Sequence, residues 1–279
     1  MKVQINDDEI YFDGFLHANL TDLMKAIKLK WDGIGMMCGY EGDGKTTLAS
    51  QICYLMDPTF SLKRCVFTPK QFIEAVDEAK PGEAIQFDEA HAAFDAKRWR
   101  DQGQQAIVSM LTRIRKKQLF ILIISPTFFD MVKYIAIHRT RFLIQIRSEG
   151  LERGYFNFYN RDRKHRLYVL GKKTEDMKAI KSNFYGRFTK FTPFNEDEYE
   201  KKKDAGEQEM RQKDKLKNSV TMIDMKRRGW TNGAIMSLKE LLGLSNEKVA
   251  NEINKRSKYS ISKDQIRLII NDYLKEIDK

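Results

Sequence analysis

Residues 39–47 carry glycine, lysine and hydroxyl side chains in the order that a phosphate-binding loop requires. They read Gly-Tyr-Glu-Gly-Asp-Gly-Lys-Thr-Thr and fit the pattern G-x-x-x-x-G-K-[ST] at every fixed position. Glycines let the backbone curl until several N–H groups point at one centre, while the lysine reaches the β- and γ-phosphates and the first threonine ligates magnesium. We therefore predict ATP and Mg²⁺ as cofactors, with the choice between ATP and GTP left open. The predicted nucleotide contacts are Gly39, Glu41, Gly42, Asp43, Gly44, Lys45, Thr46 and Thr47, and Thr46 is also a predicted magnesium ligand.

The flanking segments favour this interpretation over an ordinary glycine-rich turn. The apolar run Ile34–Cys38 precedes the loop as an expected strand, and a helical stretch follows from Thr46 to Met56. The N-terminus of a helix carries unpaired N–H groups and the positive end of the helix dipole, and both attract phosphate. A chance match to the pattern lacks such neighbours.

Two adjacent carboxylates end the apolar segment of residues 83–89. Asp88 is expected at the carboxyl end of a strand beside the phosphate loop, where it holds Mg²⁺ directly or through water. Glu89 is then placed to polarise the attacking water in γ-phosphate hydrolysis. The alternative is a strand that stops at a solvated acidic turn, which is common for an Asp-Glu pair alone.

Ser125 ends a second apolar segment, residues 119–125. A polar residue at this place often senses the γ-phosphate or orients the water, so Ser125 is a catalytic candidate and Thr127 a weaker one. The alternative is that Ser125 only caps the turn that Pro126 starts.

Hydrolysis is also expected to need an arginine on the γ-phosphate in the transition state, which contributes roughly 10³ to 10⁵ in rate. Arg139 and Arg141 are the preferred candidates, because they precede a strand expected at the nucleotide side of the sheet. Arg113 and Arg115 are the other candidates. Any of them could act across a subunit interface. For each, a solvated charge at the end of a helix is the alternative.

Strand-like and helical patterns alternate from residue 31 onward, which predicts an α/β fold with a mostly parallel sheet and helices on both faces. Two further strands around a basic turn are predicted to form an appended antiparallel hairpin. A strand at residues 3–5, continuing at 10–12, and a helix over 21–29 are expected before the alternation begins. The predicted core strands are 33–38, 65–68, 84–88, 119–125 and 142–146, the hairpin strands are 155–159 and 166–170, and a helix is predicted for 104–116.

The composition describes a globular chain with an excess of positive charge. Of the 279 residues, 42% are hydrophobic and 32% charged, and the formal net charge is +11. Such an excess favours a polyanionic partner such as nucleic acid, although many lysine-rich proteins are basic without binding it. The scattered Cys38, Cys53 and Cys65 predict reduced core thiols in the cytoplasm, with no disulfides and no zinc site. Neither a signal peptide nor a run long enough to span a bilayer is visible, so no membrane insertion is expected.

Two basic clusters are candidate contacts to double-stranded DNA, with solvated surface as the alternative for both. Side chains of this kind meet phosphates without reading sequence. The first cluster follows the carboxylate pair and consists of Lys97, Arg98 and Arg100, with Trp99 between them. The second lies at the tip of the predicted hairpin and consists of Arg161, Arg163, Lys164 and Arg166.

The charge-dense segment 195–217 is predicted to be an exposed helix or a linker between a domain of residues 1–194 and a small all-α module of residues 218–279. A capping box at residues 262–265 opens the last helix of the module. The module resembles a helix-turn-helix, in which residues 248–257 form the first helix. Lys263 and Arg267 are its predicted DNA contacts, with Lys255 and Arg256 as further basic candidates. A three-helix bundle that binds protein has the same pattern.

The phosphate loop, the strand ending in Asp88-Glu89 and the intervening strand ending at Ser125 resemble the P-loop ATPases that carry an additional strand and a catalytic glutamate. More narrowly, residues 30–200 resemble the FtsK–HerA-like and zonula-occludens-toxin-like ATPases of viruses and conjugative elements. The segments that carry this resemblance are 88–91, 97–100, 112–117, 125–130 and 134–139. The resemblance implies a RecA-like core and a homo-oligomeric ring, a pentamer or hexamer, that pumps double-stranded DNA. A capsid portal, a nuclease or a relaxase is then a possible partner. The filamentous-phage assembly branch carries a transmembrane helix after its ATPase domain, which is not expected here.

We therefore predict a magnesium-dependent ATPase that moves double-stranded DNA for genome packaging or conjugative transfer. The alternative is a nucleotide-switched DNA-binding or assembly factor with slow hydrolysis. A small-molecule kinase is less favoured, since such kinases usually lack both a base like Glu89 and the intervening strand. Residues 88–91 read Asp-Glu-Ala-His, as in superfamily-two helicases. The rest of the chain is too short and too charged for the second RecA-like domain that those helicases need.

Overall fold

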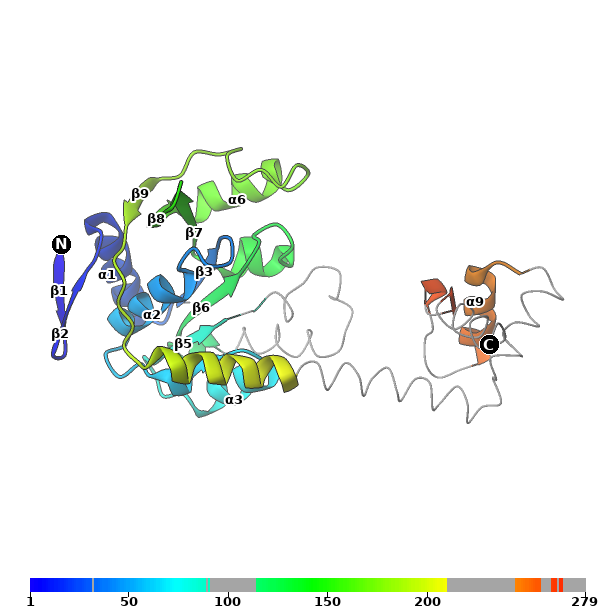
Figure 1. The fold of residues 1–279 in the computed structure, drawn as a ribbon, viewed down its shortest axis with the longest axis horizontal. Coiled ribbons are helices and arrows are strands. Elements are labelled where there is room, and N and C mark those ends of the chain that lie inside the picture. The colour runs from blue at the N-terminus through cyan, green and yellow to red at the C-terminus, as the bar shows by residue number, and fades with distance from the viewer. Residues whose placement is uncertain are drawn as a thin grey trace. The chain divides into compact units, whose positions relative to one another are not determined.

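The computed structural model describes residues 1–31, 33–88, 90, 114–209, 244–256, 262–264 and 266–267. The chain divides into two compact units, Met1–Glu207 and Gln208–Lys279. The first unit is an α/β domain built on a seven-stranded sheet (Figure 1). In the second unit, α9 (Asn246–Arg256) covers most of the first helix predicted for that module.

Part of the predicted machinery falls outside the described residues. This applies to the second carboxylate, Glu89, and to Arg113. It also applies to the whole first basic cluster, Lys97, Arg98 and Arg100. Of the helix predicted for residues 104–116, the last three residues are described, and they are helical.

The sheet has the strand order β4-β5-β6-β3-β7-β8-β9. Adjacent strands from β4 to β7 are parallel, and β8 and β9 extend the sheet in antiparallel pairs. The predicted mostly parallel sheet is therefore confirmed. Strand β6 lies between β3 and β5, so an additional strand separates the phosphate-loop strand from the strand that ends before Asp88. The strands are β3 (Gly33–Cys38), β4 (Cys65–Val66), β5 (Ala84–Phe87), β6 (Phe120–Ser125), β7 (Phe142–Glu149), β8 (Glu152–Tyr159) and β9 (Phe184–Arg187).

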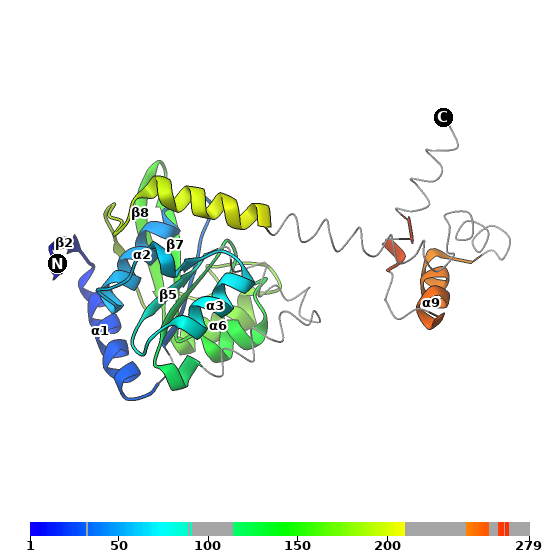
Figure 2. The ribbon, with the colours of Figure 1, turned by 90° about the horizontal axis from the view of Figure 1, so that it is seen from below.

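Helices cover both faces of this sheet (Figure 2). One face packs against α1 (Gly14–Lys28) and α2 (Lys45–Met56). The other packs against α3 (Pro69–Glu78), the π-helix Tyr134–Arg139 and α6 (Arg161–Gly171). Each face forms its own cluster of buried hydrophobic side chains, as expected for an α/β domain.

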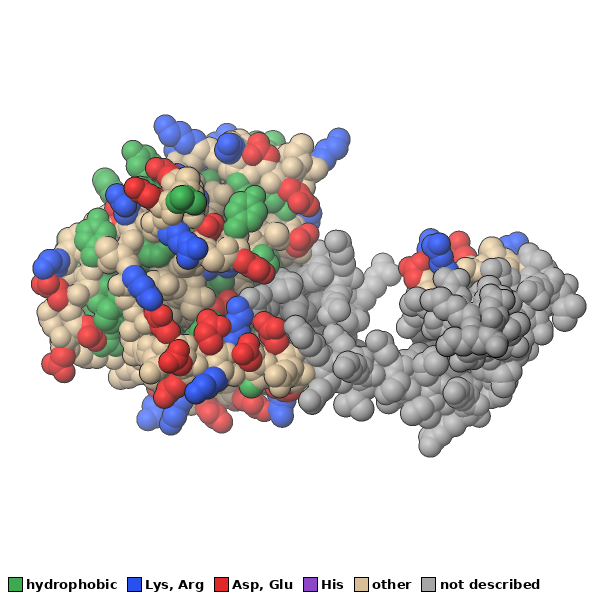
Figure 3. All heavy atoms as spheres, in the orientation of Figure 1, with side chains coloured by type: hydrophobic (Ala, Val, Ile, Leu, Met, Phe, Trp, Pro, Cys, Tyr) green, Lys and Arg blue, Asp and Glu red, His purple; other side chains and the backbone are tan. Residues whose placement is uncertain are grey.

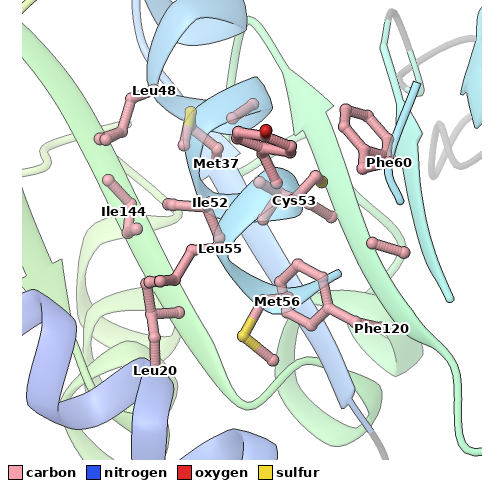
Figure 4. Close-up of a cluster of buried hydrophobic side chains, with 14 of the residues drawn as sticks. Leu20, Met37, Leu48, Ile52, Cys53, Leu55, Met56, Phe60, Phe120 and Ile144 are labelled. Carbon is pink, nitrogen blue, oxygen red and sulfur yellow. The ribbon is translucent and has the colours of Figure 1, made fainter. Parts of the chain in front are cut away.

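Strand β3 contributes to both clusters, because successive side chains point to opposite faces. Met36 belongs to the cluster under α3, and Met37 to the cluster under α2. Figure 4 shows the second cluster, in which Ile52 of α2 faces Ile144 of β7. Both isoleucines are fully buried. This packing fixes α2 on the sheet, and with it the loop at its N-terminus.

Two segments near the N-terminus differ from the prediction. Strands β1 (Lys2–Ile5) and β2 (Asp8–Tyr11) pair with each other in a separate antiparallel sheet, whereas the prediction continues one strand. Helix α1 also begins earlier than predicted. The Asp13 side chain accepts a hydrogen bond from the N–H of Leu16 at 3.0 Å and caps the helix there.

The predicted hairpin with a basic turn is wrong. Residues 161–171 form α6, and the partners of β8 are β7 and β9. The Asn160 side chain starts this helix by accepting a hydrogen bond from the N–H of Arg163. Burial then follows helical spacing through Lys164 and Leu167. A lysine takes one position of the buried stripe, which hides the helical pattern in the sequence.

The three cysteines have the predicted state. Cys38, Cys53 and Cys65 are buried and free. Burial raises the pKa of the Cys38 thiol to about 12, so it stays protonated at neutral pH. Among the described residues, we find no helix that combines the length and the apolar character needed to cross a bilayer.

Candidate nucleotide-binding site

The predicted phosphate loop connects the carboxyl end of β3 to the first turn of α2. Gly44 occupies the position before the helix and has a φ of 94°, in the left-handed region that glycine adopts without strain. This conformation turns the chain sharply into the helix. The unpaired N–H groups of the first helical turn therefore face the same side as the loop, which is the arrangement that binds phosphate at helix N-termini.

The Lys45 side chain folds back over the loop that precedes it. Its Nζ donates to the carbonyl oxygens of Gly39 at 2.9 Å and Tyr40 at 2.8 Å. A hydrogen bond of 2.6 Å from the Ser148 hydroxyl to Asp43 Oδ1 ties the loop to the end of β7. The ammonium group is thus held at the centre of the loop by neutral acceptors, which phosphate oxygens can replace with stronger charge-assisted bonds.

Thr46 and Asp88 meet at the carboxyl edge of the sheet. The Thr46 hydroxyl donates to Asp88 Oδ2 at 3.0 Å, and the Asp88 side chain is almost completely buried. One hydroxyl and one carboxylate are oxygen ligands, which suit Mg²⁺ when substrate phosphates and waters complete the octahedron. The described residues contain no group of three or more His, Cys, Asp or Glu side chains around a common point, so these two would hold the ion together with the nucleotide.

A cavity of about 700 Å³ opens over the loop. Its floor is the phosphate loop with Asp88, and its walls come from two segments that the sequence analysis did not connect with the site. Three basic side chains, Arg153, Lys190 and Lys203, lie in these walls. No motif marks them, because they lie far apart in the sequence. The wall residues are Arg153, Gly154, Phe188, Lys190, Thr192, Phe194, Glu196, Asp197, Tyr199, Glu200 and Lys203.

Residues 188–195, which we call the strap, follow β9 and line the cavity with Phe188, Lys190, Thr192 and Phe194. Figure 1 shows the path of this segment from β9 to the next helix. The Gln51 side chain of α2 anchors the strap by donating to the carbonyl oxygens of Thr189 at 2.7 Å and Phe191 at 3.1 Å. At the start of the strap, the Phe188 N–H donates to the carbonyl oxygen of Gly154 at 2.8 Å. A Cβ at Gly154 would lie 2.7 Å from the Phe188 carbonyl oxygen, and Gly154 has a φ of 96°. Only glycine fits this crossing.

Tyr199 is the functional candidate that sequence reasoning missed. It lies in a helix over residues 196–209, within the segment predicted to be an exposed helix or linker, yet its side chain is 4% exposed. Its hydroxyl donates to Asp88 Oδ2, the same oxygen that accepts from Thr46. Tyr199 is the one aromatic residue of residues 195–217, which is the signal that could have identified it.

Ser125 lies at the same edge, at the end of β6. Its side chain is fully buried, and its Oγ has no hydrogen-bond partner among the described residues. It lines a small cavity with Lys45 and Asp88. The turn after β6 is instead capped by Thr127, whose hydroxyl donates to Asp130 Oδ2 at 3.0 Å. An unpaired buried hydroxyl beside the loop is consistent with a role toward the phosphates.

The predicted position of the arginines is wrong. The Arg141 N–H donates to the carbonyl oxygen of Ile34, near the amino end of β3, and its guanidinium stacks on Trp31 at 4.7 Å. Arg139 ends the π-helix just before it. The phosphate loop follows the opposite end of β3, and a strand of that length spans roughly 20 Å. Neither arginine can therefore reach the γ-phosphate bound by its own subunit.

Arg115 lies at the same amino edge, because its Nε donates to the carbonyl oxygen of Lys30 at 3.0 Å. Lys164, a predicted DNA contact, is also misplaced. Its side chain is fully buried and donates to the carbonyl oxygens of Ala136, Ile137 and Thr140 and to the Thr140 hydroxyl. A lysine side chain that is buried in this way cannot contact DNA.

The other members of that cluster are more accessible. Arg163 donates to the carbonyl oxygens of Lys181 and Ser182 and is partly buried. Arg161 and Arg166 are exposed on α6. In the second unit, Lys263 and Arg267 are exposed.

Residues 36–149 match the family model described as "ATPase family associated with various cellular activities (AAA)". The match covers less than half of the chain, and it includes the phosphate loop, Asp88 and β7. No curated protein sequence matches the chain significantly.

Among solved structures, the N-terminal domain of zonular occludens toxin from Neisseria meningitidis is similar at 16% identity and a TM-score of 0.38, over 57% of this chain and 95% of that one. The genome packaging NTPase B204 from Sulfolobus turreted icosahedral virus 2, in complex with AMPPCP, is similar at 12% identity and a TM-score of 0.35, over 48% of this chain and 94% of that one. AMPPCP-bound DnaA from Aquifex aeolicus has 13% identity and a TM-score of 0.36, over 99% and 92%.

Proposed function

We propose that this chain, whose first unit carries an AAA/P-loop ATPase domain, is a magnesium-dependent motor that translocates double-stranded DNA. The observation that carries the hydrolytic part is the convergence of Lys45, Thr46, Asp88 and Ser125 at one edge of the sheet. The formal net charge of +11 supports a nucleic acid as the partner. A homo-oligomeric ring that encircles the duplex is the assembly that we propose.

Each residue of the site has a separate role in the transfer of the γ-phosphate to water. Loop N–H groups and Lys45 bind the phosphates, while Thr46 and Asp88 would hold the magnesium ion. When bound, the ion neutralises charge on the β- and γ-phosphate oxygens. Glu89, next to Asp88 in sequence, takes the proton of the attacking water. Ser125 orients that water or contacts the γ-phosphate.

Arginine assistance in this proposal comes from a neighbouring subunit. Arg139 and Arg141 lie on the edge of the sheet away from their own phosphate loop. A ring in which this edge faces the next subunit's cavity would bring them to a nucleotide, so activity would depend on assembly. The parallel pairing of β3 with β7 supports this part of the proposal, because it places the residues that precede β7 at the edge opposite the phosphate loop.

The DNA contacts that we propose are basic residues, four of which are exposed on the described parts of the two units. They are Arg161 and Arg166 on α6, Lys263 and Arg267 in the second unit, and the cluster Lys97, Arg98 and Arg100. The helix of residues 196–209 is not proposed as a contact, because acidic residues outnumber lysines in it. Figure 3 shows acidic side chains gathered over this helix.

The test is steady-state ATP hydrolysis by the purified protein with and without duplex DNA, together with its size in the presence of an ATP analogue. We expect turnover that DNA stimulates strongly, in an oligomeric fraction. Replacing Glu89 by Gln should reduce turnover by about 10² to 10⁴ while nucleotide binding persists. Protein that binds no ATP, or a Glu89→Gln variant with full turnover, would overturn the proposal.

One observation favours the alternative of a nucleotide-switched DNA-binding or assembly factor. Tyr199 connects Asp88 to the helix of residues 196–209, in which the second unit begins at Gln208. Such a link suits a conformational switch as well as a motor. A turnover of about one per minute or less, with DNA bound in one nucleotide state only, would favour the switch.

A further inference from the structure

Two hydroxyl groups share one oxygen of the buried Asp88 carboxylate. Thr46, from the first turn of α2, donates to Oδ2 at 3.0 Å, and Tyr199 donates to the same atom. The donors approach from opposite parts of the chain, one from the phosphate loop and one from the helix of residues 196–209. Hydrogen bonds to a carboxylate are about twice as strong as those between neutral groups, so this pair holds the carboxylate in one orientation.

Aromatic neighbours hold the side chain of Tyr199 in place. The ring stacks on Phe194 at 5.6 Å and makes an edge contact with Phe67 at 5.2 Å. These contacts fix the ring independently of the hydroxyl. Removing the hydroxyl alone should therefore leave the packing in place.

Contacts away from Asp88 also hold the same helix in place. Lys202 Nζ donates to the carbonyl oxygens of Leu62 at 2.8 Å and Lys63 at 3.2 Å. One turn further on, Gly206 packs against the side chain of Phe67. The helix is therefore docked by one contact that touches the candidate metal site and by others that do not.

We propose that Tyr199 positions Asp88 for the magnesium ion and makes the docking of the helix of residues 196–209 respond to the occupancy of that site. The inference rests on the proposed ATPase function. When magnesium binds, the Thr46 hydroxyl would become a ligand of the ion and would no longer donate to Asp88. Tyr199 would then be the donor that keeps the Asp88 carboxylate oriented. Groups that orient metal ligands in this way typically contribute 10- to 100-fold in metal affinity.

The first test is a magnesium titration of fluorescent ATP analogue binding to the full chain, which measures affinity without turnover. Replacing Tyr199 by Phe should raise the magnesium concentration at half-maximal binding by about tenfold. Nucleotide binding in EDTA should stay within about twofold of the original protein, since Lys45 and the loop are intact. An unchanged magnesium midpoint in a folded Tyr199→Phe protein would overturn the inference.

Tyr54→Phe is the matched control. The Tyr54 hydroxyl also donates to a carboxylate, Asp8 Oδ2 at 3.0 Å, and its side chain is 6% exposed, but it does not line the cavity. This variant should keep the original midpoint. A shift as large as that of Tyr199→Phe would show that loss of any such hydroxyl perturbs the site, and would count against a positioning role.

The second test is hydrogen exchange over residues 196–209 with the nucleotide analogue, with and without magnesium. We expect a magnesium-dependent difference in the original protein and none in Tyr199→Phe. Lys202→Met removes a docking contact away from Asp88, so it should speed exchange in this helix without moving the magnesium midpoint. Equal exchange with and without magnesium in the original protein would overturn the coupling.

The two levels of proposal fail in distinguishable ways. If the original protein shows no effect of magnesium on nucleotide binding, the proposed ATPase function fails and this inference fails with it. If the original protein responds to magnesium and Tyr199→Phe responds identically, the inference alone fails.

Discussion

The carboxyl edge and the amino edge of the central sheet each hold a lysine that donates to main-chain carbonyls. Comparing the two lysines distinguishes a binding residue from a structural one. At the carboxyl edge, Lys45 donates to Gly39 and Tyr40 beneath an open cavity. At the amino edge, Lys164 donates to Ala136 and other carbonyls and is fully buried. Phosphates can displace the acceptors of Lys45, whereas nothing from solvent can reach those of Lys164.

One buried hydroxyl beside the phosphate loop, that of Ser125, has no hydrogen-bond partner among the described residues. The Thr140 hydroxyl at the amino edge, in contrast, donates to carbonyl oxygens and accepts from Lys164. A buried hydroxyl without a partner costs free energy, so a phosphate or water bound at the loop would satisfy Ser125.

The largest expected effect is at Lys45. Replacing it by Ala should abolish ATP turnover and reduce nucleotide affinity by at least about 100-fold, because it is the cation that reaches the β- and γ-phosphates. Lys117 also donates to two carbonyl oxygens, those of Val76 at 2.9 Å and Asp77 at 2.6 Å, but lies before β6 at the amino edge. Lys117→Ala should bind nucleotide normally in the same fluorescence assay. Equal losses in both variants would contradict the assignment of the two edges.

The next effect concerns the arginines of the amino edge. If the proposed ring forms on DNA, alanine at both Arg139 and Arg141 should lower its turnover by about 10³ and leave nucleotide affinity unchanged, because in that proposal they act on a neighbour's nucleotide. Arg187→Ala is the control, because Arg187 likewise stacks on an aromatic ring, that of Tyr155 at 4.6 Å. Oligomer-dependent turnover that survives the double substitution would exclude both arginines.

Lys164 should matter for stability and not for binding. Lys164→Met keeps the apolar part of the side chain but leaves buried carbonyl oxygens without a donor. This loss should cost about 3 kcal/mol in the free energy of unfolding. Chemical denaturation measures this change. Lys173→Met, at an exposed position just after the same helix, should change stability by less than about 0.5 kcal/mol. Loss of nucleotide affinity in folded Lys164→Met would show that the two edges are coupled.

The same lysine predicts a pH dependence. Burial lowers the pKa of Lys164 to about 7 from its ordinary 10.5. Between these values the unfolded chain binds more protons than the folded one, so the contribution of this group to stability rises with pH. The free energy of unfolding of the original protein should therefore increase relative to Lys164→Met from pH 7 upward, by at most about 1.4 kcal/mol per pH unit. If the free energy of unfolding had the same pH dependence in both proteins, this effect of burial on Lys164 would be contradicted.

The smallest effect distinguishes two fully buried serines. Ser50 Oγ donates to Gln86 Oε1 at 3.0 Å, so Ser50→Ala should cost about 1 kcal/mol of stability and leave turnover unchanged. Ser125→Ala loses no such bond and should keep the stability of the original protein, while turnover falls about tenfold through loss of contact with the phosphates or water. Thermal unfolding and steady-state kinetics on both variants decide the matter. The reverse pattern would make Ser125 structural.

Local sequence signals predicted the parts of the fold and site that short segments determine. The phosphate loop, the apolar strands and the placement of Asp88 at a strand end follow from residue type and spacing over a few positions. The same signals predict the additional strand, β6. Its position between β3 and β5 is visible only in the strand pairing of the structure.

The errors have a common physical origin in long-range packing. Lys164 occupies a core position because carbonyl oxygens far away in the sequence accept hydrogen bonds from its ammonium group. A lysine at a buried position interrupts the apolar pattern of α6, so the sequence predicts a turn and a strand there. Arg141 precedes β7, and in a parallel sheet the residues before a strand lie at the amino edge, which the pairing of β7 with β3 confirms. Tyr199 stands 111 residues after Asp88, so no local pattern could join them.

The glycine at position 154 limits how this nucleotide pocket can diversify. Any other residue there would push the Phe188 carbonyl aside and lift the strap from the entrance. Affinity would then fall although every phosphate contact remained intact. Adaptation of the entrance to a different base or sugar would therefore use side chains of the strap, such as Phe188 and Thr192, or the neighbouring Arg153, while position 154 stays glycine.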